Sequence, residues 1–158
     1  MNNLIIFSAK YLYIVEVALL VLCWMVLPKN RRRALLILSV IYLPLVYVVA
    51  KVGGILYVDP RPFVVGHFAP LIPHAMDNGF PSDHMLLGSA IASIIFVYNR
   101  KWGTVAWVVA FVVGASRVFA GIHHWIDIVG SVVIAVVMMW IVNHYLIPRQ
   151  IKKRISGK

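Results

Sequence analysis

The sequence is poor in acidic residues, in cysteine and in charge altogether. It has 15 Lys and Arg but only five Asp and Glu, and charged residues make up 13% of its 158 positions. Soluble domains carry about 25% charged and about 45–50% apolar residues, whereas 62% of this chain is apolar. An ordinary water-soluble protein is therefore excluded. The single cysteine, Cys23, also excludes an intramolecular disulfide and a cysteine-based metal cluster.

Apolar segments fill most of the chain and predict an all-α fold, an integral membrane bundle of about five transmembrane helices. The expected spans are residues 11–27, 34–56, 84–98, 103–120 and 125–147. One span uses about 20 residues, so we expect residues 1–158 to form a single membrane-embedded domain. Pro44 is interpreted as a kink rather than an end. The first segment is interpreted as a retained helix, and the short, small-residue-rich third segment as one suited to packing inside the bundle.

The basic residues predict the orientation of this bundle. Eleven of the 15 follow the first, third or fifth segment: Lys29, Arg31, Arg32, Arg33, Arg100, Lys101, Arg149, Lys152, Lys153, Arg154 and Lys158. Loops rich in Lys and Arg stay on the cytoplasmic side. The formal charge of +10 thus indicates topology rather than nucleic-acid binding, and we expect the N-terminus and the loops 58–83 and 121–124 to lie outside.

The remaining polar residues gather near the outer boundary and favour phosphoryl transfer. Arg61 and Arg117 offer the rigid fork of donors that matches phosphate oxygens. Ser82 precedes the third span, where an N-cap and outward-pointing amides would form an anion site. His123 and Asp127 are four residues apart, so we expect them on one helical face, with the carboxylate fixing one imidazole nitrogen and leaving the other free as nucleophile or base.

Less specific interpretations compete at several positions. His67, His74, His124 and His144 are interpreted as structural or interfacial residues. A metal site built from His and Asp is the alternative for the whole cluster, but two nearby arginines disfavour a cation there. For Glu16, within the first span, a buried ion pair, a protonated acid and a headgroup contact remain open.

Three short motifs resemble the signature of the type-2 phosphatidic acid phosphatase superfamily of membrane lipid phosphatases. They are Arg61-Pro62, then Phe80-Pro81-Ser82-Asp83-His84, then Ser116-Arg117 followed by His123 and Asp127. The resemblance extends through the spans. Three features specifically resemble the undecaprenyl-diphosphate phosphatase branch, which is associated with bacitracin resistance. They are Asp59-Pro60-Arg61-Pro62-Phe63-Val64, Pro73-His74-Ala75 and Asp83.

This resemblance implies a mechanism that needs no metal or cofactor. His123 would attack the terminal phosphorus to form a phosphohistidine, and Asp127 would orient it. His84 would protonate the leaving oxygen and then activate water. The phosphoryl oxygens would be held by Arg61, Ser82, Arg117 and Lys51.

Departures from the superfamily pattern concern three features. The superfamily lysine seven residues before the motif arginine is here Gly54, and Lys51, one turn earlier, could substitute. Asp83 replaces the usual glycine between Ser82 and His84, either capping the helix start, pairing with an arginine or tuning His84. Many members have six spans, and this chain is expected to lack the first.

The resemblance implies hydrolysis of undecaprenyl diphosphate on the outer face of a bacterial cytoplasmic membrane, which recycles the carrier lipid for envelope synthesis. The partners would be a polyprenyl diphosphate and membrane lipid. The alternative within the class is a phosphatase of another lipid phosphate, such as phosphatidylglycerol phosphate or phosphatidic acid. A non-catalytic lipid carrier or permease is the alternative from a different class.

Overall fold

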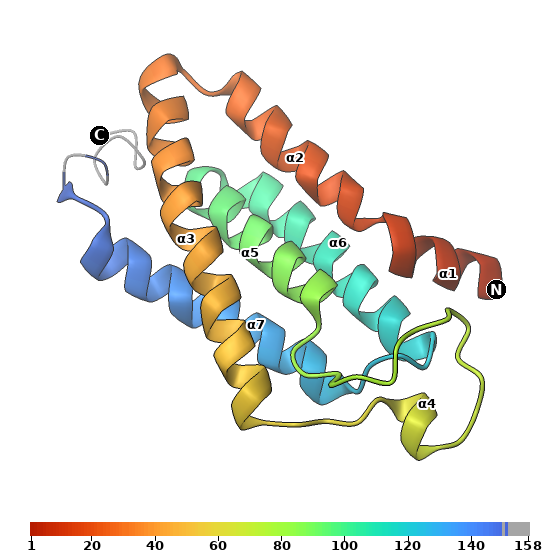
Figure 1. Cartoon of the computed structure of the whole chain (residues 1–158). Coiled ribbons are helices and arrows are strands. Elements are labelled where there is room, and N and C mark those ends of the chain that lie inside the picture. The colour runs from red at the N-terminus through yellow and green to blue at the C-terminus, as the bar shows by residue number, and fades with distance from the viewer. Residues whose placement is uncertain (150, 152–158) are drawn as a thin grey trace.

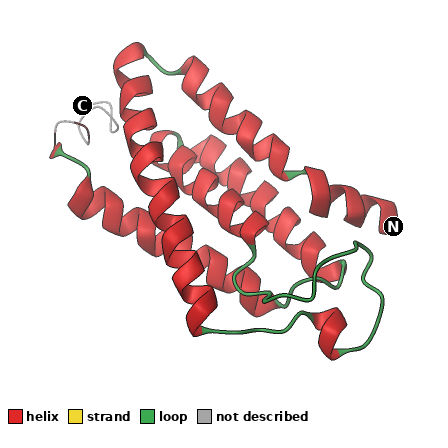
Figure 2. Ribbon diagram, viewed as in Figure 1, coloured by secondary structure: helices red, strands yellow, loops and turns green. Residues whose placement is uncertain are grey.

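The computed structural model describes residues 1–149 and 151, and within them every regular element is a helix (Figures 1 and 2). The elements are α1 (Asn2–Tyr11), α2 (Tyr13–Val26), α3 (Lys29–Leu56), α4 (Pro62–Val65), α5 (Asp83–Tyr98), α6 (Arg100–Phe119), α7 (Trp125–Ile141) and a π-helical extension of α7 (Val142–Leu146). This confirms the expected all-α class. The expected topological cations Lys152, Lys153, Arg154 and Lys158 lie outside the described residues.

The apolar helices correspond to the five expected spans. Among the described residues, α3, α6 and α7 with its extension are each long and apolar enough to cross a membrane. The pair α1 and α2, bent by 43°, forms a fourth candidate, and α5 is a shorter apolar helix. The protein is therefore a multi-pass helical membrane protein. As expected, α3 continues through Pro44.

Three helices begin earlier than the hydropathy pattern predicts. The first element starts at Asn2 instead of residue 11, with a break at Leu12, because polar residues there do not interrupt the helix. Helix α3 starts directly after Pro28. Helix α6 starts at Arg100 because the Asn99 side chain accepts a hydrogen bond from the Trp102 amide at 3.2 Å and caps the helix. Hydropathy marks the apolar length of a helix and not its polar first turns.

Helix α5 lies at the centre of the bundle and contacts α2, α3, α6 and α7. Most of its residues are buried, as its small side chains predicted. At Gly88 a β-carbon would lie 2.6 Å from both carboxylate oxygens of Glu16, so a larger residue there would push this carboxylate aside. Glu16 is fully buried, and its oxygens have no hydrogen-bond partner among the described residues. The headgroup interpretation of Glu16 is therefore wrong.

The two ends of the bundle differ in what they carry (Figure 1). One end, here called the site end, holds the loops 57–82 and 120–124. The other, here called the basic end, holds the turns around Pro28 and Asn99 and the end of α7. The described topological cations of the α2–α3 and α5–α6 connections share the basic end, as the sequence predicted. The expected site residues lie at the opposite end.

Candidate active site

His123 and Asp127 form a buried pair at the start of α7. His123 Nδ1 lies 3.0 Å from Asp127 Oδ2, and the side chains are 2% and 0% exposed. The same oxygen accepts the His124 amide at 2.9 Å. Because a carboxylate accepts and does not donate, Nδ1 carries the hydrogen and Nε2 is the unprotonated nitrogen.

The backbone around this contact differs from the expected one. The prediction that both residues lie on one helical face is wrong, because α7 begins at Trp125 and His124 is its N-cap. His123 therefore lies before the helix, and Asp127, in the first turn, reaches back to it.

Two buried guanidinium groups converge on the unprotonated nitrogen and donate to it. Arg61 Nη1 is 3.3 Å and Arg117 Nη2 is 3.4 Å from His123 Nε2, although Arg117 comes from α6 and Arg61 precedes α4. Each arginine is 5% exposed. Arg61 is held by the Ile122 carbonyl at 2.8 Å and by Asp77 at 2.7 Å. An anion placed against Nε2 would therefore meet two forked donors at once.

The same surroundings set the protonation of His123. Burial is the main cause that holds the pKa of His123 below its usual value; the hydrogen bond with Asp127 opposes this, and Arg117 and Arg61 add to the lowering. The imidazole is therefore neutral at neutral pH. A neutral ring with one nitrogen fixed and the other free is the nucleophilic form.

Six of the eight expected site residues line one cavity of about 350 Å³ at the site end: Lys51, Arg61, Asp83, His84, Arg117 and His123. Asp127 supports His123, and its second oxygen, Oδ1, is buried without a hydrogen-bond partner among the described residues. His84, at the start of α5, packs edge-on against Tyr13 with ring centroids 5.1 Å apart. The cavity thus unites residues from α3, the 57–82 loop, α5, α6 and the 120–124 loop.

Sequence comparison identifies the family of this chain. Residues 34–151 match the PAP2 superfamily. The chain belongs to the PAP2 superfamily. It is 31% identical over 137 residues to the bacitracin transport permease protein BcrC of Bacillus licheniformis, a match that covers 86% of this chain and 67% of the relative.

Two further relatives are similar over most of the chain. The undecaprenyl-diphosphatase BcrC of Bacillus subtilis is 30% identical, with 87% of this chain and 71% of the relative covered. The putative undecaprenyl-diphosphatase YbjG of Escherichia coli is 34% identical, with 83% and 66% covered. No solved structure matches the chain significantly.

The missing PAP2 lysine has a structural reason. At Gly54 a β-carbon would lie 2.9 Å from the Phe80 carbonyl oxygen, so a lysine there would displace the backbone of the 57–82 loop. Lys51 lines the cavity from one turn earlier and lies 3.6 Å from Asp83. These two side chains are 54% and 67% exposed and form the rim of the cavity. Among the described residues, Asp83 therefore pairs with a lysine and with no arginine.

Ser82 takes the expected N-cap position of α5 but does not line the cavity. Its amide and carbonyl contact α7, through the Asp127 carbonyl at 3.4 Å and the Ser131 hydroxyl at 3.0 Å. Its own hydroxyl is buried and has no partner among the described residues. The preceding Phe80 ring packs on Gly130, where a β-carbon would lie 2.2 Å from the ring. This segment therefore fixes the start of α5 against α7.

Asn78 supports the site through its side-chain amide, and the sequence did not indicate this role. Its Oδ1 accepts the amides of Asp59 at 2.8 Å and Phe80 at 3.0 Å, and its Nδ2 donates to the carbonyls of Gly54 at 2.7 Å and Tyr57 at 3.1 Å. All four hydrogen-bonding positions of the amide are used. Asn78 thereby ties the end of α3 to the segment that carries Arg61. The only signal in the sequence is its place in a loop between two motifs.

Two of the histidines interpreted as structural lie close to the site. His74 lines the cavity, and its Nε2 is 3.5 Å from Arg117 NH2. Burial, with Arg61 and Arg117, lowers the pKa of His74. His124 does not line the cavity, and its Nδ1 bonds Asp59 Oδ2 at 2.8 Å. His74 belongs to the Pro73-His74-Ala75 motif, and this motif could have indicated that His74 lies at the site.

One group of residues could hold a metal ion. Among the described residues, Asp59, His124 and Asp127 place one potential ligand atom each within 4.8 Å of the others. These atoms already bond one another or the His124 amide. His123 Nε2, the free nitrogen, faces the arginines instead, so the donor set at that nitrogen fits an anion.

Proposed function

We propose that this chain is a membrane phosphatase that converts undecaprenyl diphosphate to undecaprenyl phosphate and inorganic phosphate, and so recycles a carrier lipid for peptidoglycan synthesis. One observation carries the proposal. A buried imidazole whose unprotonated Nε2 lies against two arginines lines a cavity that shares Asp83 with an apolar groove. The names of the Bacillus subtilis and Escherichia coli relatives agree with this substrate.

The apolar groove favours a lipid over a water-soluble phosphate ester. It runs between α3 and α5 and shares Asp83 with the active-site cavity. Its other lining residues are Leu43, Val46, Tyr47, Leu86, Leu87 and Ala90. A substrate with an anionic head and a long apolar tail would contact both surfaces, with Lys51 at the point where they meet.

In the first step, the lone pair of His123 Nε2 attacks the terminal phosphorus. The bond from this phosphorus to the bridging oxygen breaks, and the proton of His84 passes to that oxygen, so undecaprenyl phosphate leaves. Asp127 accepts the hydrogen bond from Nδ1, which keeps its hydrogen, and stabilises the charged ring. Arg61 and Arg117 neutralise the charge that grows on the phosphoryl oxygens.

In the second step, water attacks the phosphorus of the phosphohistidine. His84 takes the proton of this water, the bond between phosphorus and Nε2 breaks, and inorganic phosphate is released. Both histidines return to their starting states. The guanidinium pair supplies the electrostatic stabilisation that a bound cation supplies in many other phosphatases.

We place the active site on the outer face and the C-terminus in the cytoplasm, following the positive-inside rule. Met76, 83% exposed in the 57–82 loop, gives a test in a Cys23→Ala background. Met76→Cys should react with an impermeant maleimide on intact cells, whereas Lys101→Cys at the basic end should react only after permeabilisation. The reverse pattern would invert the topology.

Phosphate release by the purified protein tests the activity. Wild type should hydrolyse undecaprenyl diphosphate faster than phosphatidic acid, and His123→Ala should hydrolyse neither, whereas the distant control His144→Ala should remain active. Rapid quenching with terminally ³²P-labelled substrate should trap an acid-labile phosphoenzyme that is absent in His123→Ala.

Other outcomes would select the alternatives. Faster turnover of phosphatidic acid or phosphatidylglycerol phosphate would identify a different lipid phosphate as the substrate. Binding of lipid without any hydrolysis would favour a carrier or permease, the role named for the Bacillus licheniformis relative.

A further inference from the structure

The bend between α1 and α2 lies outside the segment that matches the PAP2 superfamily, yet it contacts the active site. Just before the bend, the Ala9 carbonyl accepts a hydrogen bond from Arg117 Nη1 at 3.2 Å. In an unbroken α-helix this carbonyl would accept the amide of Tyr13, four residues on. Among the described residues that bond does not form, because α1 ends at Tyr11 and α2 begins at Tyr13. The bend therefore leaves a backbone acceptor available to a catalytic arginine.

Just after the bend, Tyr13 contacts the second catalytic histidine. Tyr13 is the first residue of α2, and its ring meets the His84 ring edge-on, with 5.1 Å between the centroids and 89° between the planes. His84 lines the active-site cavity, whereas Tyr13 does not. Tyr13 can therefore influence a bound substrate only through His84.

The two catalytic histidines are held in different ways. His123 is fixed through a nitrogen, because its Nδ1 bonds Asp127 at 3.0 Å. Among the described residues, neither ring nitrogen of His84 makes a hydrogen bond or an ion pair with a protein group, and its ring contact is Tyr13. Edge-to-face packing is a preferred geometry of aromatic pairs. The Tyr13 ring thus limits the orientation of His84 while leaving both of its nitrogens available for proton transfer.

A second contact between α2 and α5 fixes the position of Tyr13. Tyr13 and Glu16 are three residues apart on α2, and the residues they meet, His84 and Gly88, are four apart on α5. Residues at these spacings share a helical face. The buried Glu16 carboxylate lies directly against the backbone at Gly88. The two contacts together set the register in which Tyr13 meets His84.

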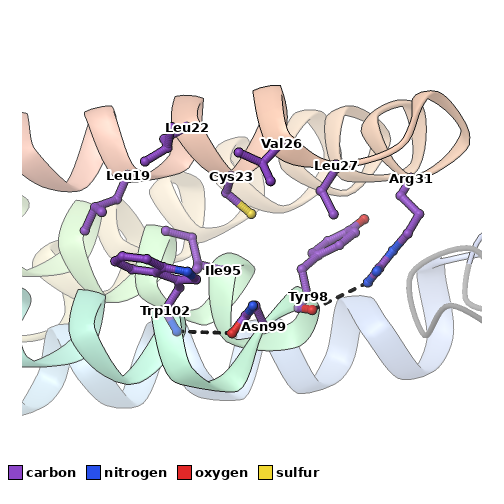
Figure 3. A pocket seen from close by; sticks show the side chains of 10 residues that line it. All are labelled: Leu19, Leu22, Cys23, Val26, Leu27, Arg31, Ile95, Tyr98, Asn99 and Trp102. Atoms are coloured by element: carbon purple, nitrogen blue, oxygen red, sulfur yellow. Dashed lines mark hydrogen bonds between the residues drawn. The ribbon is translucent and has the colours of Figure 1, made fainter.

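Farther from the bend, α2 leaves space beside α5. A cavity of about 350 Å³ lies between α2, the end of α5 and the start of α6 (Figure 3). The residues of α2 that line it all follow Glu16: Leu19, Leu22, Cys23, Val26 and Leu27. The contacts of Tyr13 and Glu16 precede this cavity, so they belong to the part of α2 that is nearest the active site.

We propose that Tyr13 is a positioning residue for His84 and that the α1–α2 bend holds it in place. The ring contact keeps a nitrogen of His84 turned toward the leaving oxygen in the first step and toward water in the second. This assignment rests on the proposed phosphatase mechanism and adds to it an element outside the PAP2 match.

Steady-state hydrolysis of undecaprenyl diphosphate by the purified full-length protein tests the assignment. Tyr13→Leu keeps an apolar side chain but removes the ring, and it should lower kcat about tenfold with little change in KM, because His84 is misplaced and binding is not. Tyr13→Phe keeps the ring and should retain the wild-type kcat. Tyr11→Leu is the matched control: this tyrosine ends α1, is 50% exposed, and should tolerate the change.

A double variant separates positioning from a structural role. His84→Ala should lower kcat by about 10²–10⁴-fold, the contribution of a general acid and base, and its residual rate is measured with terminally ³²P-labelled substrate. Adding Tyr13→Leu should lower this rate no further, because Tyr13 acts through a side chain that is no longer there. Tyr13→Met takes the place of Tyr13→Leu if the latter does not fold, since its flexible side chain fills irregular space.

Three results would overturn the assignment: wild-type kcat in Tyr13→Leu, equal losses in Tyr13→Leu and Tyr13→Phe, or a further tenfold loss in the double variant. Each of them requires an active wild type, so each leaves the proposed function standing. A wild type that does not hydrolyse the lipid would overturn the proposed function and this assignment together.

Discussion

Both ends of the bundle carry arginines, but only the site end buries them fully. Arg61 and Arg117 are 5% exposed and lie against one imidazole. At the basic end, Arg33 is exposed, and Arg32 lies over the Trp24 ring with its guanidinium on the Leu27 and Met25 carbonyls. A buried charge costs several kcal/mol unless it is paired. Two cations side by side in an apolar bundle therefore indicate that an anion completes the site.

The hydrogen bonds of Arg117 illustrate this difference between the two ends. Arg117 donates to the Ala9 carbonyl at 3.2 Å, but its Nε is buried with no hydrogen-bond partner among the described residues. Arg61 forms an ion pair with one carboxylate, that of Asp77, and this side chain is largely exposed. Among the described residues, the two guanidinium groups of the site end thus have only the Asp77 carboxylate as an ion-pair partner, whereas Arg32 at the basic end donates to backbone carbonyls.

The largest effect is expected from the buried carboxylate. Asp127→Asn should lower kcat by about 10³–10⁴-fold with little change in KM, because an amide can hold the ring in the wrong tautomer and cannot stabilise its charge. Asp77→Asn, which changes an exposed carboxylate on Arg61, should cost about tenfold or less. Steady-state kinetics on both variants give the comparison. Equal losses would mean that Asp127 contributes no more to catalysis than Asp77, which only holds Arg61.

The second-largest effect is expected from replacing either of the two buried arginines. Arg61→Lys and Arg117→Lys keep the charge but lose the fork, and each should lower kcat/KM by about 10²–10³-fold. Arg33→Lys at the basic end should leave the rate unchanged. Full activity in Arg117→Lys would show that only net charge matters, and the contrast between the two ends would lose its physical basis.

The pH profile should report the lowered pKa of His123. As pH falls through this pKa, the ring gains a proton and loses its nucleophilic lone pair, so kcat/KM should fall about tenfold per unit on an acid limb that lies below pH 6.5. Arg117→Gln removes one cause of the lowering, so its acid limb should move to higher pH.

The control for this shift is Arg33→Gln, measured with the same substrate so that the ionisation of the substrate cancels. A shift of the Arg117→Gln limb to lower pH would contradict the assignment of His123 as the titrating nucleophile.

The smallest effect is expected at the rim. Lys51→Met should raise KM about tenfold or less and leave kcat nearly unchanged, because an exposed cation attracts the headgroup without contacting the reacting bond. Lys10→Met, an exposed lysine of α1, is the matched control and should change neither constant. A kcat loss as large as that of Arg117→Lys would make Lys51 a full replacement for the PAP2 lysine.

The sequence predicted those parts of the molecule that repeat or that carry charge. Hydropathy located all five apolar helices, and the runs of basic residues predicted one shared end for the α2–α3 and α5–α6 connections. Motif residues far apart in the chain, such as Arg61 and Arg117, were correctly expected near one another. These features depend on residue type and order alone.

Contacts that depend on side-chain direction or loop path could not be predicted in this way. The His123–Asp127 contact forms across a helix start, not along a helical face. The four bonds of Asn78 depend on how the 57–82 loop returns to the end of α3. Glu16 became interpretable only when α5 placed Gly88 opposite it.

Asn78 also has a consequence for the chemical ageing of the protein. An asparagine followed by glycine loses its amide most readily, because Gly79 does not shield its own backbone nitrogen from attack on the side chain. Here the Gly79 amide donates to the Asp59 carbonyl at 2.8 Å, and all four positions of the Asn78 amide are occupied. Folding therefore protects the residue that unfolding would expose to deamidation. In a chain that deamidates while unfolded, a carboxylate would replace the two Nδ2 donors that bind the Gly54 and Tyr57 carbonyls.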